Sequence, residues 1–445
     1  MNESTFQQAA GQVTRRDFIE DGLKLGAGAA VGGSILAAGT TQQARAATRR
    51  ASSTGAVRFW VQPYGDPKAW NTLLEQNVAA FKKQTGITVH YEVIPWASAL
   101  QKWDLAMGTG DVPDVGDMFY LQSRVLQGRG KWGPLDLTSH VKSGAFGDYQ
   151  RFVPVARREA AYKGAVYGIP WRIDIRAFIY DSNLWPSVPA TYNDFAQMAS
   201  SAVTSKKLIA AAQTIGVPYQ QLKVIAAAWG LEFLTPDLKH STLMDPRWGQ
   251  VCTWIQNMVN KRVLLQQAAT NLTLPAFDNF LEGRVAVLLG GNHQVVPTAQ
   301  GTAPRMVSKI SSGLMPTGPA GKHFSIASTA QFSIFENTKA KAESLQWVRY
   351  LTSPAVNKQW SIVSGQDPSD TVVQNMLANA FTRAIYLQSR TAFGIDQPTP
   401  AWAEISASPT GPATKLAIDV FSGANVHTAL SQAHTGIEAI LAKYK

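Results

Sequence analysis

Cysteine is almost absent from this sequence, and so are the common catalytic motifs. Cys252 is the only cysteine among the 445 residues, which excludes an intramolecular disulfide and any metal site built from several cysteines. The seven histidines form no pair at helical spacing, and no zinc-protease, nucleophile-elbow, P-loop or dinucleotide-binding motif occurs. The sequence therefore predicts a protein with no cofactor, no metal centre and no enzymatic activity.

Negative charge is also scarce. The chain has 41 Lys plus Arg against 30 Asp plus Glu, a net charge of +11, which by itself suits nucleic acid, an anionic membrane surface or an acidic ligand. Hydrophobic residues make up 45% and charged residues 16%, which excludes both wholesale disorder and a polytopic membrane protein. A length of 445 residues predicts two or three domains.

The N-terminal 46 residues have the pattern of an export signal. Arg15 and Arg16 precede an uncharged stretch rich in glycine and alanine, residues 25–44, and Ala44-Arg45-Ala46 then fits a small-residue cleavage pattern. Paired arginines before a weakly hydrophobic segment resemble a twin-arginine (Tat) signal. A transmembrane anchor is the alternative, since about 20 uncharged residues can span a bilayer, but the many glycines favour a cleaved signal.

Export changes how the charge is interpreted. Residues 1–46 contain four basic and four acidic side chains, so the mature chain keeps the whole excess of +11. An exported protein does not meet genomic DNA, so we expect no nucleic-acid partner. We expect a periplasmic protein cleaved near Ala46, and the lack of a cysteine beside the cleavage site excludes a lipid anchor there.

The mature chain alternates strand and helix patterns. Residues 57–61 predict a strand, residues 88–94 predict a second, and Gly86 ends the helix between them. One face of that helix consists of Trp70, Leu73, Leu74, Asn77, Val78 and Phe81. A strand–helix–strand order of this kind favours a parallel sheet.

Later segments continue the alternation. Residues 191–194 resemble a capping box at the start of a helix, with aspartate in place of glutamate. Cys252 shares a helical face with Trp248 and Ile255, so we expect a buried core thiol rather than a nucleophile. Residues 284–289 predict a short apolar strand.

Six short motifs occur in order along the mature chain. They are Phe81–Val89 (F-x-x-x-x-G-I-x-V), Gly110–Val115 (G-x-x-P-D-V), Leu135–Leu137 after Pro134 (P-L-D), Gly168–Asp181 (G-I-P and a following strand), Phe280–Val287 (F-x-x-G and an apolar run) and Ala342–Pro354 (a helix ending in L-T-S-P). Together they cover almost the whole mature chain and resemble the bacterial extracellular solute-binding proteins of family 1, the maltose-binding-like ligand receptors of ABC importers.

The resemblance implies an α/β, two-lobed periplasmic-binding-protein fold of type II with a ligand cleft between the lobes. The chain would cross between the lobes about three times, at residues 170–174, 313–318 and 365–368. The first lobe would contain residues 54–171 plus 317–364, and the second residues 174–312 plus 368–445. The resemblance also implies a monomer that closes on its ligand and docks on the transmembrane permease subunits of an importer.

The candidate ligand residues follow from sugar chemistry and from the motifs. The C–H face of a pyranose packs on aromatic rings, and its hydroxyls need polar groups that are fixed in place. The carboxyl ends of strands face the crevice in such sheets. The candidates are Trp60, Gln62, Tyr64, Asp117, Phe119, Tyr120, Trp171, Arg172, Asp174, Trp229, Asn292, His293, Phe324, Gln366, Asp367 and Trp402.

Two positions depend most on the resemblance. In the family, the position that matches Asp174 often offers a carboxylate to the ligand, although a surface pair of Asp174 with Arg176 is the alternative. The loop that contains Asn292 and His293 frequently presents a tryptophan to the sugar in relatives. A histidine there suggests a hydrogen bond in place of stacking, and an exposed loop residue is the alternative.

Two other functions are alternatives to sugar binding by an importer receptor. Asp111, Asp114 and Asp117 could form the carboxylate cluster of an enzyme, but Asp114 belongs to a family motif and Asp111 to a turn, so binding is favoured. The net charge of +11 and Arg172 could select an acidic sugar, a sugar phosphate or another anion. We therefore expect a neutral or acidic oligosaccharide as the ligand.

Overall fold

The computed structural model describes residues 56–119, 132–206, 208–266 and 273–444. These residues belong to one compact unit, which extends from Ser52 to Lys445. The predicted export signal and the candidate Tyr120 lie outside the described residues. Among the described helices, none is both long enough and apolar enough to cross a bilayer.

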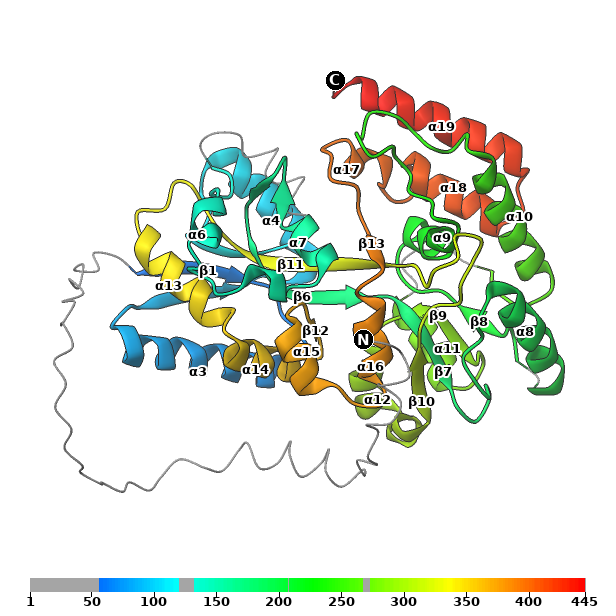
Figure 1. Ribbon diagram of the computed structural model, residues 1–445, viewed down its shortest axis with the longest axis horizontal. Helices are drawn as coiled ribbons and strands as arrows, with labels where there is room; N and C mark the ends of the chain where they lie inside the picture. The colour runs from blue at the N-terminus through cyan, green and yellow to red at the C-terminus, as the bar shows by residue number, and fades with distance from the viewer. Residues whose placement is uncertain (1–55, 120–131, 207, 267–272, 445) are drawn as a thin grey trace. The chain divides into compact units, whose positions relative to one another are not determined.

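Seven strands form the first of two main sheets (Figure 1). Its order is β12-β6-β11-β3-β1-β2, and β13 pairs with β11 beside this path. The strands are β1 (Val57–Val61), β2 (Val89–Val93), β3 (Val115–Met118), β6 (Ile169–Ile175), β11 (Ser325–Ile334), β12 (Asp367–Pro368) and β13 (Ala392–Gly394). The predicted parallel pairing is confirmed for β1 with β2, whereas β11 runs antiparallel to both β3 and β6.

Four strands form the second sheet, in the order β10-β7-β9-β8. They are β7 (Ala177–Asp181), β8 (Ala212–Gln213), β9 (Val287–Gly291) and β10 (Ile310–Gly313). A separate hairpin pairs β4 (Ala161–Tyr162) with β5 (Ala165–Val166). The strand predicted at residues 284–289 is β9, displaced toward the C-terminus because the N–H groups of Arg284 and Val285 bond the carbonyl of Asn279 instead.

Helices connect and cover these strands. Up to Asn260 they are α3 (Pro67–Thr85), α4 (Trp96–Thr109), α6 (Thr138–Lys142), α7 (Pro154–Glu159), α8 (Tyr192–Lys206), α9 (Pro218–Ala226) and α10 (Pro246–Asn260). Beyond it they are α11 (Thr273–Leu281), α12 (Val295–Thr302), α13 (Lys341–Leu351), α14 (Pro354–Ser364), α15 (Thr371–Leu377), α16 (Thr382–Gln388), α17 (Trp402–Ile405), α18 (Pro412–Phe421) and α19 (Val426–Ala442). Short 3₁₀ turns are η1 (Tyr149–Arg151), η2 (Ala227–Trp229) and η3 (Pro304–Lys309).

Helix α3 shows why local patterns predict the early elements well. The side chain of Asp66 accepts a hydrogen bond from the N–H of Ala69, and Pro67 occupies the first position, where its missing N–H costs nothing. Gly86 ends the helix with a φ of 79°, a conformation that favours glycine because a Cβ is strained there. The face from Trp70 to Phe81 is buried against the first sheet, as predicted.

Aromatic rings form a connected group within the first core. Trp171 on β6 stacks on Phe332 of β11, with ring centroids 5.6 Å apart, and Trp360 meets both rings edge-on. Phe59 of β1 continues the contact toward Trp347 on α13. Because burying one such side chain contributes about 1.5–3 kcal/mol, these rings hold the centre of the first sheet rigidly.

The second core lies beside the second sheet and includes α9, α10, α18 and α19. Trp248, Val251, Cys252 and Ile255 are buried along α10, which confirms the predicted helical face. The capping box at Thr191 is confirmed as well, since its hydroxyl donates to Asp194 Oδ2 at 2.8 Å and the Asp194 N–H donates back to Thr191 Oγ1 at 3.1 Å.

The two sheets are joined where β6 passes into β7. Only Arg176 separates these strands, although they belong to different sheets. The N-terminal residues of β11 pair with β13 and with the end of β6, and its C-terminal residues pair with β3. The β6–β11 pair, drawn in teal and yellow in Figure 1, is therefore the structural link between the two sheets.

The neighbouring segments bear on where the lobes divide. Thr317 exchanges backbone hydrogen bonds with Ala190 and Tyr192, so the residues just before β11 stay with the second sheet. Helix α15 packs on α14, and Asp370 pairs with Arg151 at 2.8 Å, so the residues just after β12 stay with the first. These contacts favour lobe boundaries near Ser325 and after α15 instead of the predicted boundaries at residues 317 and 368. The division into lobes remains a prediction.

The burial of Cys252 predicts its reactivity. Burial raises the pKa of this thiol to about 12, so almost no reactive thiolate exists at neutral pH. We expect no maleimide labelling of the folded protein at pH 7 and complete labelling in 6 M guanidinium, measured by mass spectrometry. Fast labelling of the folded protein would contradict the buried position.

Candidate functional site

Three strands of the first sheet bring polar and aromatic side chains to one edge. β1, β3 and β6 run in the same direction, because β1 is parallel to β3 and β11 is antiparallel to both β3 and β6. Their carboxyl ends therefore meet, as the prediction required. Tyr64 follows β1, Phe119 follows β3, and Arg172 lies in the middle of β6.

A buried polar network holds this edge together. Asp117 Oδ2 accepts a hydrogen bond from the Tyr64 hydroxyl at 2.8 Å, and Asp117 Oδ1 accepts one from Trp171 Nε1 at 2.8 Å. Arg172 Nε donates to the Tyr64 oxygen at 3.1 Å. When the Gln62 side-chain amide is oriented so that both its nitrogen and its oxygen have partners, its nitrogen donates to Asp117 Oδ2 at 2.9 Å. Burial raises the pKa of Asp117, and the charge of Arg172 opposes this shift.

Trp96 completes this edge, and the sequence prediction missed it. Its side chain is 44% exposed, although its Nε1 donates to Pro63 O at 2.8 Å and its ring contacts Tyr64 and Phe119. The Arg172 guanidinium lies 6.0 Å from the ring centroid. Trp96 lies three residues after the end of β2, as Tyr64 does after the end of β1, so the rule about strand ends that selected Tyr64 would have selected it too.

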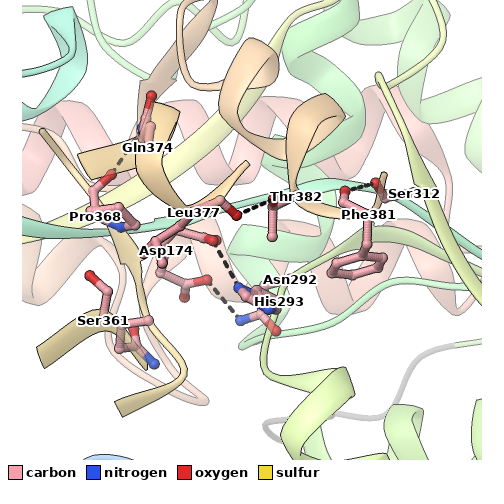
Figure 2. Close-up of polar contacts among 12 residues, drawn as sticks. Asp174, Asn292, His293, Ser312, Ser361, Pro368, Gln374, Leu377, Phe381 and Thr382 are labelled. Atoms are coloured by element: carbon pink, nitrogen blue, oxygen red, sulfur yellow. Dashed lines mark hydrogen bonds and ion pairs between the residues drawn. The ribbon is translucent and has the colours of Figure 1, made fainter. Parts of the chain in front are cut away.

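Two hydrogen-bonded pairs connect the first sheet to the loop after β9 in the second (Figure 2). Asn292 Nδ2 donates to Asp174 Oδ1 at 2.7 Å, and His293 Nδ1 lies 2.9 Å from Asp367 Oδ1. Burial raises the pKa of Asp367, and His293 opposes this shift. Asp174 also lies 3.4 Å from Arg176, so the alternative pair exists together with the contact with the loop, but it is largely buried and not a surface pair.

Gln366 links the two hydrogen-bonded pairs between the sheets to Arg172 and the polar network around it. Its Oε1 accepts a weak hydrogen bond from Arg172 Nη1 at 3.4 Å, and it directly precedes Asp367. Asn292 Oδ1 is buried and has no hydrogen-bond partner among the described residues. The strand-edge site, as we call it, comprises Tyr64, Trp96, Asp117, Arg172, Asp174, Asn292, His293, Gln366 and Asp367.

The remaining candidates lie elsewhere. Trp60 is buried beside Trp103, and Phe119 is almost buried in the same cluster. Trp229 and Trp402 are buried in the second core, where the Trp402 Nε1 donates to Asp396 at 2.7 Å. Their burial favours packing over ligand contact.

Phe324 and Trp171 complete the list of candidates. Phe324 packs on Phe393 with ring centroids 4.9 Å apart and is partly buried. Trp171 is buried, and only its Nε1 takes part in the polar network, through Asp117.

A cavity of about 480 Å³ lies between α7, the segment after η2 and the segment that begins at β13. It is lined by Arg158, Glu159, Gly230, Leu231, Glu232, Leu234, Thr235, Pro236, Leu238, Thr242, Asp245, Arg247, Phe393, Gly394, Asp396, Gln397 and Pro398. None of the candidates from the sequence lines it. Its residues come from segments that are far apart in the chain, and no local pattern signals their proximity.

Glu159 is a buried acid of this cavity with a strongly raised pKa. Its Oε2 accepts hydrogen bonds from the hydroxyl and the N–H of Thr329 at 2.7 and 3.1 Å. Burial raises the pKa of Glu159 to about 7, and the charge of Asp396 adds to the effect, while the bond from Thr329 opposes it. Burial raises the pKa of Asp396 as well.

The sequence profile described as bacterial extracellular solute-binding protein matches residues 76–384. The chain belongs to this family. The match includes β6, β9 and β11, which carry or position most of the strand-edge site. A protein of Brucella abortus (strain 2308), named as a binding protein, is 25% identical over 387 residues, which cover 80% of this chain and 86% of that protein.

Solved structures share the fold. The sugar-binding protein MalE of Xanthomonas citri has a TM-score of 0.75 at 20% identity and covers 88% of this chain and 98% of its own. The GacH receptor of Streptomyces glaucescens, solved without ligand and with acarbose, has a TM-score of 0.72 at 19% identity, with coverage of 88% and 99%. The chain is thus a mixed α/β protein of the two-lobed maltose-binding type, as predicted.

The strand-edge site offers polar and aromatic groups that can bind a ligand. Among the described residues, no group of three His, Cys, Asp or Glu side chains could hold a metal ion. Asp114 and Asp111 were considered above as part of an enzymatic carboxylate cluster. In the structure, Asp114 accepts a hydrogen bond from the N–H of Arg58 at 2.8 Å, and Asp111 pairs with the Arg58 side chain. The family and its solved relatives are binding proteins.

Glu159→Gln tests the electrostatics of the cavity. The pKa of Glu159 rises from 4.5 in the unfolded chain to about 7 on folding, so its stabilising effect is complete below about pH 4.5 and is lost as the pH rises through 7. The free energy of unfolding of the wild type should therefore fall, relative to Glu159→Gln, between about pH 5 and pH 8. Urea unfolding at both pH values measures this difference.

Glu75→Gln is the matched control, because Glu75 is exposed on α3. Its pH profile should parallel that of the wild type. If the profile of Glu159→Gln is also parallel, the raised pKa of Glu159 is wrong.

Proposed function

We propose that this protein is the substrate-binding receptor of an ABC importer, which captures a carbohydrate and delivers it to transmembrane permease subunits. The observation that carries the proposal is the strand-edge site. Trp96 presents an exposed ring beside side chains that the network of Tyr64, Asp117 and Arg172 fixes in place. A flat ring next to fixed polar groups is the arrangement that a pyranose needs.

The contacts between the two sheets support capture by closure of two lobes. Asp174 and Asp367 belong to strands of the first sheet, while Asn292 and His293 follow a strand of the second. A ligand held at this point touches both sides and stabilises the closed form, because it binds that form better. The buried Asn292 Oδ1 has no partner among the described residues, and a ligand hydroxyl could reach this acceptor only when the lobes separate.

The solved relatives supply the ligand class. The protein of Xanthomonas citri is described as sugar-binding, and that of Arthrobacter globiformis binds cyclic alpha-maltosyl-1,6-maltose, with a TM-score of 0.73 at 13% identity. For this chain, an uncharged oligosaccharide fits better than an acidic one. The Arg172 charge is already opposed by the buried Asp117, through the shared Tyr64 hydroxyl.

We also propose the route by which the receptor reaches its ligand. The paired arginines and the Ala44-Arg45-Ala46 pattern support Tat export and cleavage near Ala46. The mature receptor would then work in the periplasm as a monomer without a lipid anchor. Its permease partners follow from the family.

Trp96→Ala tests the stacking surface. Loss of one aromatic platform should weaken carbohydrate binding about tenfold or more, while the exposed position of the ring should leave the melting temperature of the free protein nearly unchanged. A thermal-shift screen of oligosaccharides finds the ligand, since binding raises the melting temperature, and calorimetry then compares the affinities.

Trp132→Ala is the matched control, because Trp132 is also exposed and lies beside Gly110, ahead of β3. It should bind as the wild type does. Equal affinities of Trp96→Ala and the wild type would remove Trp96 from the site, and shifts with amino acids or polyamines alone would refute the carbohydrate assignment.

Replacement of Arg15 and Arg16 by lysine tests the export route. A Tat signal depends on the arginine pair, so the Lys-Lys variant should stay in the cytoplasm as the uncleaved precursor. Cell fractionation and N-terminal sequencing of the exported wild type measure both points. Export of the variant at the wild-type level would show that another pathway is used.

A further inference from the structure

Asp367 on β12 is a buried carboxyl group whose ion-pair partner comes from the other sheet. Only 2% of its side chain is exposed, and its Oδ1 lies 2.9 Å from Nδ1 of His293. β12 belongs to the first sheet, whereas His293 follows β9 of the second, so this contact joins the two lobes (Figure 2). Among the described residues, no lysine or arginine forms an ion pair with Asp367.

The Asp367 carboxylate depends on the charge of His293, because a buried carboxylate without a cation is unfavourable. Burial raises the pKa of Asp367, and the nearby charge of Asp174 adds to the effect, whereas His293 opposes it. A protonated His293 therefore compensates the Asp367 carboxylate. A neutral His293 donates only an uncharged hydrogen bond, which is roughly half as strong.

The other charged and titratable groups near this contact have partners of their own or stay neutral. Asp174 on β6 lies 3.4 Å from Arg176, and Arg172 on the same strand belongs to the network of Asp117. Burial raises the pKa of Tyr386 on α16 far above the neutral range, so this phenol keeps its proton. The helix that follows the histidine, α12, contains no charged residue.

The His293 ring is held in place and still reaches water. The ring of Phe381 lies 5.5 Å from it at an angle of 50°, and 24% of the His293 side chain is exposed. Water can therefore supply or remove its proton. Arg383 on α16 is exposed, so solvent screens its charge. Histidine is the side chain whose charge ordinarily changes between about pH 5 and pH 8.

We propose that His293 and Asp367 form a pH-sensitive latch between the lobes, which favours the closed form while His293 is protonated and releases it once His293 is neutral. The latch rests on the proposed function, because it requires that the two lobes open and close. On opening, the loop after β9 moves away from β12, so Asp367 regains water and no longer needs the histidine. Low pH therefore favours closure, and high pH favours opening.

The latch also controls access to the strand-edge site, because the same loop contains Asn292. While the lobes are closed, Asn292 Nδ2 donates to Asp174 Oδ1 at 2.7 Å, and Asn292 Oδ1 is buried. Release of the latch exposes both Asn292 and Asp174. The charge of His293 thus sets how open the strand-edge site is before a ligand arrives.

The test measures the distance between the lobes without any carbohydrate. Dyes on Glu75→Cys in α3 and Gln432→Cys in α19, both exposed positions, report closure by single-molecule energy transfer in a Cys252→Ala background. With the latch intact, the closed-to-open ratio should fall about fivefold from about pH 5.5 to about pH 8, since a charged hydrogen bond is roughly twice as strong as a neutral one. His293→Gln can still donate to Asp367 but does not titrate, so its ratio should stay constant.

His427→Gln is the matched control, because His427 is an exposed histidine on α19, which packs on α10 and α18. Its ratio should fall with pH as that of the intact latch does. Asp367→Asn removes the carboxylate and should abolish the fall.

The proposal is wrong if the ratio of the intact latch is constant or rises with pH. It is also wrong if His293→Gln, or Asp367→Asn with a normal melting temperature, keeps the fall. These results leave the proposed function intact, because the thermal-shift screen tests carbohydrate binding separately.

Discussion

The antiparallel pairing of β6 with β11 is the interaction on which the rest of the structure depends. These two strands are neighbours in the first sheet, and β6 passes through Arg176 directly into β7 of the second. On one face they position Arg172 and Asp174, and on the other they position Thr329 against Glu159. A shift of this pairing by one residue would turn every one of these side chains to the wrong face.

Most of the aromatic residues form a rigid core, and Trp96 presents an exposed ring for binding. Among the 13 tryptophans, only Trp96 and Trp132 expose more than a third of their surface, and most of the others are buried. Burial of these rings supplies hydrophobic free energy and leaves the first core with little room to deform. Trp96 can stay exposed because its Nε1 is anchored to Pro63 and its edge rests on Tyr64.

The buried polar groups carry a cost that points to function. Asp117, Arg172 and Asp367 are removed from water, which is unfavourable unless each gains hydrogen bonds or an opposite charge. The structure satisfies them mutually, through Tyr64, Trp171, Gln366 and His293. A core built for stability alone would use apolar side chains there, so the network is best explained by the need to hold binding groups in a fixed arrangement.

The family, the α/β alternation and the individual elements near the N-terminus can all be predicted from the amino-acid order alone. These features depend on short-range chemistry: the period of apolar residues along α3, the cap at Asp66 and the left-handed Gly86. Strand-end reasoning also placed Tyr64 and Asp117 in one region, and the family resemblance added Arg172. It could not show that Trp229 and Trp402 are core residues, because exposure depends on what packs over a side chain.

Only the tertiary structure decided which distant groups meet. Asp174 and Asn292 are 118 residues apart, and Glu159 and Thr329 are 170 apart, yet each pair is in hydrogen-bond contact. The path of the chain between the sheets and the register of β6 on β11 fix these contacts, and no local pattern encodes either. For the same reason the cavity, whose lining comes from three separate segments, could be found only in the folded protein.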